Sequence, residues 1–282
     1  MSSKSHSIFR SNRCCLIITG ASKGFGRILA KKFANQFSDQ FTDDKESIIK
    51  FILIARNVNE IDSLANELRS IDSRINISKI ITDLAETKAI DDISQEFERN
   101  QNNLSRPYDH YILIHNAGSI GKATELCKTV NVNDADKRNA YYRLNLYSVM
   151  EMTGIFLRHI ETKPNVSHCH IINVSSLAAI QPMSGMLDYC VGKAAREAYF
   201  KQLSNELTAN NDSKRTKTKY RLLNYAPGPL DTEMFRQLQQ ESTLQEQFRE
   251  IIPLKPEDSA DKLFQILHED KFANAAHVDY YD

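Results

Sequence analysis

Residues 14–26 read CCLIITGASKGFG and contain the transition on which the fold depends. The run CCLIIT has the character of a buried strand, and residues 24–36 have the pattern of a helix. The glycines therefore lie between the carboxyl end of a strand and the amino end of a helix. Glycine lets the backbone turn tightly and approach a phosphate, and free helix N–H groups attract the anion. This context predicts a dinucleotide-binding loop, with a helix-entry loop that binds nothing as the alternative. The loop residues are Gly20, Ser22, Lys23, Gly24, Phe25 and Gly26.

Further apolar runs follow this first one, with helical segments between them. The runs are IIKFILIA at 48, INISKIIT at 75, YILIH at 111, HIINVSS at 170, RLLNYA at 221 and AAHVDYY at 275. They are continuously apolar rather than alternating, as expected when helices cover both faces of a sheet. The pattern predicts an α/β fold with a doubly wound parallel sheet of about seven strands, a Rossmann fold, in one domain over 1–282.

The helical segments are expected at 24–36, 59–70, 86–100, 134–160 and 187–209. In the last of these, one apolar face is formed by Leu187, Val191, Ala194, Ala195 and Ala198. Two polar stretches, 38–47 and 210–219, are typical of solvated loops. The segment 231–255 predicts one or two helices that cover a substrate, and a surface helix pair is the alternative.

Charge and composition exclude several classes of protein. The 282 residues carry 36 basic and 36 acidic side chains, so we expect neither a nucleic acid nor a membrane as partner. No apolar run approaches the length of a membrane span, and the N-terminus lacks the apolar core of a signal peptide. The five cysteines, odd in number, suit reduced thiols and a cytoplasmic protein. His168, Cys169 and His170 alternate along a strand, so we expect no metal site.

The spacing Gly-x-x-x-Gly-x-Gly resembles the short-chain dehydrogenase/reductase family. Two short motifs agree with it. Asn116-Ala117-Gly118 follows the fourth strand, where the family has an Asn-Ala-Gly that braces the sheet and borders the cofactor. Asp83-Leu84 ends the third strand, where the family cradles adenine.

The end of the second strand indicates which nicotinamide cofactor is used. An enzyme specific for NAD is expected to carry an acid there, but this chain has Ile54-Ala55-Arg56-Asn57. Arg56 can pair with the 2′-phosphate of NADP, and Lys23 adds a second positive charge. Asn57, next to Arg56 in the chain, is a further candidate for contact with the cofactor. We therefore expect NADP(H), with two solvated surface cations as the alternative.

Tyr189 and Lys193 form a Tyr-x-x-x-Lys pair one helical turn apart. Ser176 matches the family's catalytic serine, with Ser175 as the adjacent competitor, and Asn145 matches its fourth catalytic position. The resemblance implies that hydride reaches a carbonyl carbon while Tyr189 protonates the oxygen and Ser176 hydrogen-bonds it. The ammonium of Lys193 would lower the pKa of the phenol and hold the nicotinamide ribose. Asn145 would hold a water that links Lys193 to solvent.

Within the family, the chain resembles reductases of pterin side-chain ketones, which act in the last steps of tetrahydrobiopterin synthesis. The segments that carry this resemblance are 20–27, 189–196, 224–232 and the ending AHVDYYD at 276–282. It implies that the carboxylate of Asp279 accepts two hydrogen bonds from the pterin and that the protein is a homodimer. Gly228 would lie against the substrate, and the residues bordering the nicotinamide would be Pro227, Leu230, Asp231 and Thr232.

Two other functions stay open at this point. A reductase of apolar diketones such as benzil would share the catalytic residues, but would have no use for Asp279. A regulatory protein that senses NADPH without catalysis would need neither Tyr189 nor Ser176 beside the nicotinamide.

Overall fold

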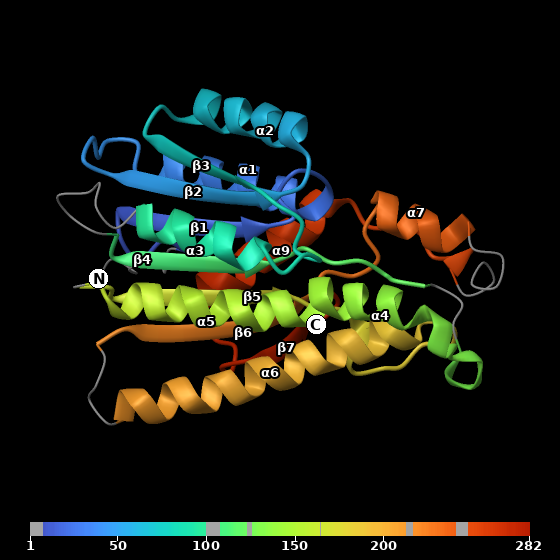
Figure 1. Ribbon diagram of the computed structural model, residues 1–282. Coiled ribbons are helices and arrows are strands. Elements are labelled where there is room, and N and C mark those ends of the chain that lie inside the picture. Colours follow the sequence, from blue (N-terminus) through green and yellow to red (C-terminus); the bar gives the residue numbers. More distant parts are fainter. Residues whose placement is uncertain (1–7, 100–107, 123–125, 164, 213–216, 241–247) are drawn as a thin grey trace.

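The central sheet has seven strands, and every pair of neighbours in it is parallel. The computed structural model describes residues 8–99, 108–122, 126–163, 165–212, 217–240 and 248–282. The strand order is β3-β2-β1-β4-β5-β6-β7, which confirms the predicted doubly wound fold (Figure 1). The strands are β1 (Arg13–Thr19), β2 (Ile48–Ala55), β3 (Ile75–Ile81), β4 (His110–His115), β5 (His168–Val174), β6 (Lys219–Ala226) and β7 (Ala276–Asp279).

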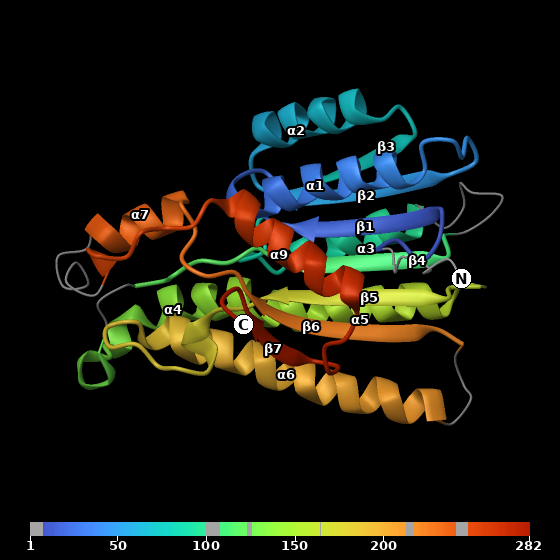
Figure 2. The ribbon, with the colours of Figure 1, turned by 180° about the vertical axis from the view of Figure 1, so that it is seen from behind.

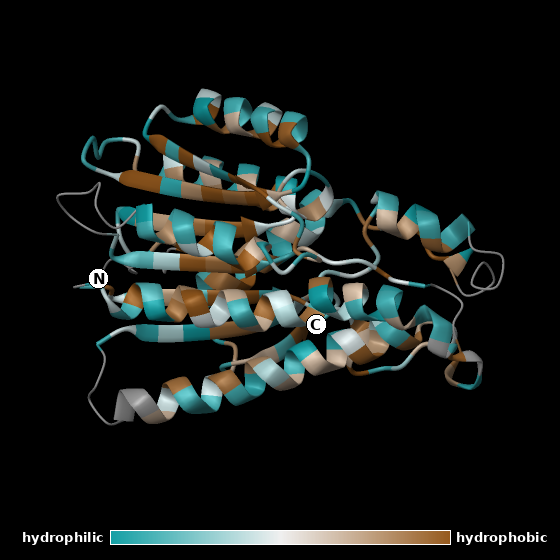
Figure 3. Cartoon of the chain, in the orientation of Figure 1, coloured by the Kyte–Doolittle hydropathy of each residue, from teal (hydrophilic) through white to brown (hydrophobic). Residues whose placement is uncertain are grey.

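Helices cover both faces of this sheet, and a large apolar cluster lies between the sheet and the helices on each face. One face carries α1 (Gly24–Gln40), α2 (Val58–Ile71) and α9 (Pro256–Glu269), which Figure 2 shows from the front. The other carries α3 (Ala89–Arg99), α5 (Ser148–Glu161) and α6 (Leu187–Asp212). Figure 3 shows the apolar residues concentrated in the strands and on the inner sides of most helices.

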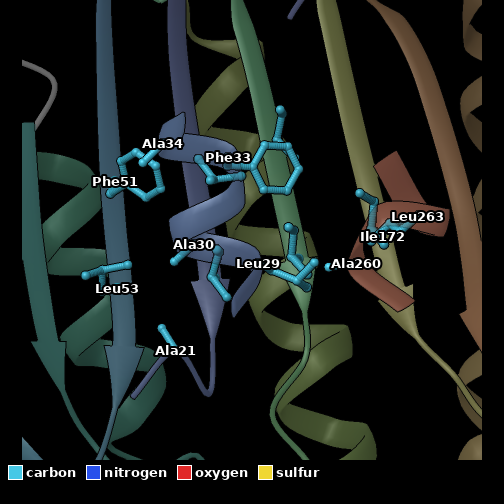
Figure 4. Close-up of a cluster of buried hydrophobic side chains, with 14 of the residues drawn as sticks. Ala21, Leu29, Ala30, Phe33, Ala34, Phe51, Leu53, Ile172, Ala260 and Leu263 are labelled. Atoms are coloured by element: carbon cyan, nitrogen blue, oxygen red, sulfur yellow. The ribbon is translucent and has the colours of Figure 1, made fainter. Parts of the chain in front are cut away.

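The cluster beneath α1 illustrates why these segments fold against one another. Phe51 of β2 lies beside Ala34 of α1, and Leu263 of α9 lies beside Ile172 of β5 (Figure 4). Leu29 and Phe33 of α1 belong to the same cluster. Such large side chains each contribute about 1.5–3 kcal/mol when removed from water. Four residues apart on a helix, Leu29 and Phe33 share the face that turns toward the sheet.

The order in which strands are added to the sheet reverses between β1 and β4, and the glycine-rich loop lies at this point. The chain proceeds from β1 outward to β2 and β3, and then returns to add β4 on the other side of β1. In sheets of this kind a crevice opens at the carboxyl ends of the two strands, because their following connections diverge to opposite faces. Helix α4 (Ala135–Tyr142) and helix α7 (Glu233–Gln240) lie beyond that edge of the sheet (Figure 1).

The helix predicted over 134–160 is present but is not regular. It consists of α4, a π-helical turn at Arg143–Tyr147 and then α5. The side-chain amide of Asn145 donates to the carbonyl oxygen of Tyr141 at 2.9 Å, and its oxygen accepts from the backbone of Ser119 at 3.0 Å. Asn145 thus pairs with one backbone group in α4 and with one in the loop after β4. Short 3-10 turns occur at Cys127–Thr129, Val132–Asp134 and Leu177–Ala179.

The apolar face predicted on α6 does not lie on the core. Val191 is 46% exposed, and Ala194 and Ala198 are exposed beside it. The inner face instead contains the polar residues Lys193, Arg196 and Glu197, together with Phe200. Apolar spacing alone could not reveal this, because α6 supplies functional groups to the edge of the sheet, and those groups must lie on its inner side.

Three predicted segments have different limits in the structure. α1 continues through Gln40 into the predicted loop at 38–47, because the buried ring of Phe37 holds its last turn on the core. The loop at 210–219 begins after α6 ends at Asp212, and its residues 213–216 lie outside the described ones. The segment 231–255 contains α7, while its residues 241–247 are also outside. Within the described residues, no helix combines the length and apolarity that a membrane span requires.

Candidate active site

The glycine-rich loop leaves the amino end of α1 open to an anion. Gly20 and Gly24 have φ values of 66° and 54°, which favour glycine. A Cβ atom on Gly26 would come within 2.4 Å of the carbonyl oxygen of Gly20, so no larger residue fits there. Lys23 caps α1 without a side-chain hydrogen bond, and the first turn has no acidic residue. These features fit the pyrophosphate of a dinucleotide.

Asn116 holds this loop in place from the neighbouring strand. Its side-chain amide donates to the carbonyl oxygens of Thr19 and Gly20, each at 3.1 Å. The hydroxyl of Thr19 accepts from the backbone nitrogens of Asn116 and Ala117, both at 3.0 Å. The two strands at the switch point are therefore tied together at their carboxyl ends, as the resemblance implied for this motif.

The two cations proposed for the 2′-phosphate lie at the surface, each paired with an acid. Arg56 is 72% exposed along its side chain and donates to Asp83 at 3.2 Å. Lys23 pairs with Glu233 at the start of α7. Exposed pairs of this kind are worth only about 0–1 kcal/mol, so a phosphate can displace either acid.

Asn57 and Leu84 have structural roles in addition to any contact with a cofactor. The side-chain oxygen of Asn57 accepts from the backbone nitrogen of Glu60 at 3.2 Å and caps α2. Leu84 is buried in the core beneath the sheet edge. Of the residues predicted near adenine, Asp83 keeps its carboxylate at the surface, where it accepts from Arg56 and from the backbone of Ala85.

The segment that follows β6 approaches the glycine-rich loop. Gly228 has a φ of 76°, and Leu230 forms a bridge with Leu254 that fixes the course of the chain. The methyl group of Thr232 lies 3.7 Å from where a Cβ atom on Gly24 would stand. The structure therefore brings two of the predicted cofactor segments, 20–26 and 227–232, to the same place.

Ser176, Tyr189 and Lys193 come together at the carboxyl end of β5. Ser176 starts the turn after this strand, and its hydroxyl is near enough to Tyr189 to lower the pKa of the phenol. The Nζ atom of Lys193 lies 5.6 Å from the centre of the Tyr189 ring and donates to the carbonyl oxygen of Val174 at 2.7 Å. The residues predicted from their spacing thus form one cluster.

The adjacent serine has a different partner. The hydroxyl of Ser175 donates to the buried carboxylate of Glu197, and Ser175 is itself buried. Of the two candidates, Ser176 is the one that acts on the pKa of Tyr189, because the hydroxyl of Ser175 is committed to Glu197. We therefore retain Ser176 as the candidate for the substrate oxygen.

Burial, more than charge, sets the protonation of these groups. Burial raises the pKa of Tyr189, while the hydrogen bond with Ser176 and the charge of Arg196 act in the opposite direction. Burial and the charge of Arg196 hold the pKa of Lys193 well below its usual range, and Glu197 opposes them. Arg196, which the sequence did not single out, thus adds a second cation near the phenol, and the effect of Lys193 on the pKa of Tyr189 stays a prediction.

Asn145 lies on the same side of the sheet but is not bonded to Lys193. Its amide is occupied by Tyr141 and Ser119, and a Cβ atom on Gly118 would lie 3.1 Å from its oxygen. The side chain therefore shapes the π-helical turn and the loop after β4. The link through water to Lys193 stays a prediction.

Asp279 is the last residue of β7, so it lies at the carboxyl ends of the strands, as Ser176 does after β5. It pairs in register with Ala226 of β6, which in turn neighbours β5, so Asp279 stands two strand spacings, about 10 Å, from β5. Its carboxylate accepts from the backbone of Tyr281 at 3.1 Å, and its backbone donates to Asp282 at 2.7 Å. These bonds turn the last residues of the chain back on themselves and fix the carboxylate there.

Three polar residues near the site were missed in the sequence. Arg196 is fully buried and donates to the carbonyl oxygens of His115 and Ala117 at 2.9 and 3.3 Å. Glu197 is buried against His277 of β7. The available signal was their position three and four residues after Lys193, which places them on the same side of α6.

Comparison with known proteins agrees with this geometry. The family model described as short chain dehydrogenase matches residues 15–243. A sepiapterin reductase from Bos taurus is 33% identical over 96% of this chain and 95% of its own length. One from Meriones unguiculatus is 34% identical, over 94% and 95%.

Solved structures share the fold. A short chain dehydrogenase from Shigella flexneri 2a, solved with NADP, matches with a TM-score of 0.73 at 19% identity, over 99% of this chain and 100% of its own. The NADPH-dependent reductase YwfH, involved in bacilysin biosynthesis, matches with a TM-score of 0.71 at 18% identity, over 95% and 96%. Because the family model matches residues 15–243 and the relatives are similar over nearly the whole length, the chain belongs to the short-chain dehydrogenase family.

Proposed function

We propose that this protein is an NADPH-dependent reductase of pterin side-chain ketones, with sepiapterin and 6-pyruvoyl-tetrahydropterin as substrates in tetrahydrobiopterin synthesis. The observation that carries the proposal is the place of Asp279, at the same sheet edge as Ser176 and about 10 Å from β5. A carboxylate at that separation can grip one end of a fused ring while the side-chain ketone lies at Tyr189. The relatives named sepiapterin reductase, which match nearly the whole chain, support the same substrate.

The residues around the glycine-rich loop suit NADP(H). The open amino end of α1 receives the pyrophosphate, and Arg56 and Lys23 exchange their surface acids for the 2′-phosphate. Asn116-Ala117-Gly118 and the segment Pro227–Thr232 border the nicotinamide end. When bound, the cofactor supplies a hydride to the carbonyl carbon.

Tyr189 gives its proton to the carbonyl oxygen. Because burial raises its pKa, the phenol holds that proton at neutral pH, as a donor must. The hydroxyl of Ser176 donates to the same oxygen and stabilises the charge that develops there. Lys193, anchored on the carbonyl of Val174, holds the ribose hydroxyls and returns a proton to Tyr189.

Asp279 fixes the pterin by accepting two parallel hydrogen bonds from its amino-pyrimidine edge. Gly228 lets the backbone pass close to the ring, since its φ is 76° and a Cβ atom there would come within 2.7 Å of Leu254. The segment 231–255, which starts with α7, covers the substrate as part of the same single domain.

The protein works as a homodimer in the cytosol. Val191 on α6, Tyr147 on the π turn and Met150 on α5 are each more than two fifths exposed, and they are apolar groups that a second subunit can cover. All five cysteines are free thiols and four of them are buried, which is typical of a reducing compartment.

The test is consumption of NADPH, followed by absorbance, with sepiapterin and with benzil as alternative substrates. We expect turnover with sepiapterin, and Asp279→Ala raises its Michaelis constant at least about tenfold, because a charged bidentate contact is lost. Benzil is the internal control, since it has no edge for this carboxylate and its kinetics should not change. Turnover of benzil alone would favour a diketone reductase, and no consumption with either would favour a protein that only binds NADPH.

A further inference from the structure

Helix α6 carries three charged residues on its inner side within five positions. Lys193 is 7% exposed, Arg196 is fully buried and Glu197 is 3% exposed. The hydrogen bonds of both cations in the described part of the chain go to backbone carbonyl oxygens, at Val174 and Ser175 for Lys193 and at His115 and Ala117 for Arg196. Arg196, and Lys193 when it is protonated, thus have the carboxylate of Glu197 beside them, and an uncompensated buried charge is costly.

Glu197 is itself fixed from two neighbouring strands. One oxygen of its carboxylate accepts from the hydroxyl of Ser175, which follows β5, and from the Nδ1 atom of His277 in β7 at 2.7 Å. The second oxygen of Glu197 is buried without a hydrogen-bond partner among the described residues. In surroundings of low dielectric such as these, a carboxylate acts strongly on the charges near it.

Ser175 connects this carboxylate to Lys193. Its hydroxyl donates to Glu197, while its carbonyl oxygen accepts from the Nζ atom of Lys193 at 3.4 Å. The orientation of Ser175 therefore depends on Glu197, and the position of the amine depends in part on Ser175. Glu197 lies one turn of α6 beyond Lys193, so its charge also acts directly across the helix.

Among the other titratable groups described near this region, the buried carboxylate of Asp188 on α6 is paired with Arg138 and Tyr142. The remaining groups supply no negative charge. Burial raises the pKa of Tyr141 on α4 and of Tyr189 on α6, so both phenols are neutral. Burial lowers the pKa of His115 on β4 well below its usual range, which leaves it neutral too. Arg196 adds positive charge, and His277 bonds to Glu197 rather than to the amine.

We propose that Glu197 is a positioning residue of the reductase, which keeps Lys193 charged and in place beside Tyr189 through its own buried carboxylate and through Ser175. The inference rests on the proposed function, since it assigns a role within that active site. It separates Glu197 from a purely structural link between β5, α6 and β7, because a structural link has no effect on the charge of Lys193.

The experiment is the pH dependence of kcat/KM for the reduction of sepiapterin by the full-length protein, in the wild type and in Glu197→Gln. We expect the loss of activity at high pH to begin about one to two pH units lower in the variant, since one nearby buried charge has been removed. Glu197→Asp keeps the charge and should retain the profile of the wild type. Glu206→Gln makes the same change at an exposed position of α6 and should also leave the profile unmoved.

An unmoved profile in Glu197→Gln overturns the proposal, and so does an equal loss of activity at every pH. Should Glu197→Gln fail to fold, NMR of the wild type with labelled lysine, assigned with Lys193→Met, decides instead. An ammonium at pH 7 supports the proposal and a neutral amine contradicts it. A wild type that reduces no carbonyl would refute the proposed function, while the NMR result would still decide the charge of Lys193.

Discussion

At the scale of single residues, the site depends on polar groups that are removed from water. Tyr189 lies against Lys193 and near the fully buried Arg196, so its surroundings contain positive charge and little solvent. Burial favours the protonated phenol, and the neighbouring charge limits how far the pKa rises. The balance suits a group that must give up a proton and regain it in each cycle.

Tyr189→Phe should lower kcat by about 10²–10⁴-fold, because the proton donor is lost while the packing of the ring is kept. Binding of NADPH, followed by the fluorescence of the cofactor, should change little, since Phe removes no group from the glycine-rich loop. Tyr199→Phe on the same helix is the matched control and should keep full activity. Retained turnover in Tyr189→Phe would refute the mechanism.

Arg56→Asp should reverse or abolish the preference for NADPH over NADH. The change removes the guanidinium that pairs with the 2′-phosphate and places two carboxylates together, at positions 56 and 83. The measurement is kcat/KM with each cofactor. Arg69→Asp, an equally drastic change at an exposed position on α2, should leave the ratio as it is. An unchanged ratio in Arg56→Asp would exclude Arg56 as the selecting residue.

At the scale of the elements, capping and irregular turns position the functional residues. Asn57 is the N-cap of α2, which begins at Val58. This start of the helix sets the direction in which the chain leaves Arg56 at the end of β2. The π turn within 134–160 performs the corresponding role on the other side of the site, because it presents Asn145 to the loop after β4.

Asn57→Ala should lower the free energy of unfolding by about 0.5–2 kcal/mol through loss of this cap. Urea denaturation measures the change. Asn57→Asp keeps an oxygen acceptor at the amino end of α2 and should be as stable as the wild type. Equal stability of Asn57→Ala and the wild type would mean that the bond to Glu60, at 3.2 Å, does not form in solution.

At the scale of the whole molecule, the two ends of the parallel sheet differ in chemistry. The carboxyl ends of the strands carry the candidate active site. The opposite end contains buried histidines, in which Nε2 of His110 and Nδ1 of His170 lie 2.8 Å apart. The Nδ1 atom of His110 accepts from the backbone of Arg10, so its Nε2 donates to His170 and both rings are neutral.

This pair predicts how stability depends on pH. Burial lowers the pKa of His110 well below its usual range and that of His170 to about 3. The unfolded chain takes up these protons near pH 6.5, whereas the folded chain does not. The contribution of the two rings to the free energy of unfolding is therefore fully present above pH 6.5, and it is lost as the pH falls below that value. Each ring should cost about 1.4 kcal/mol per pH unit below that point. Urea denaturation between pH 7 and 5 measures how the free energy of unfolding changes with pH. His170→Gln should lower by one the number of protons taken up on unfolding, and so make this dependence shallower. An unchanged dependence would contradict the assignment.

The sequence by itself determined the order of strands and helices along the chain and the glycine-rich loop, and it predicted the candidate reactive residues. These follow from local rules: continuous apolar runs form buried strands, glycines permit the turn after β1, and Tyr189 and Lys193 share a helix face through their spacing. Only the tertiary structure decided which face of α6 packs on the sheet. The apolar Val191 is exposed, because the polar residues Lys193 and Arg196 occupy the inner face near the carboxyl ends of the strands. It also assigned Ser175 to Glu197 and brought Asp279 to the same edge as Ser176, since contacts between distant strands leave no local pattern in the chain.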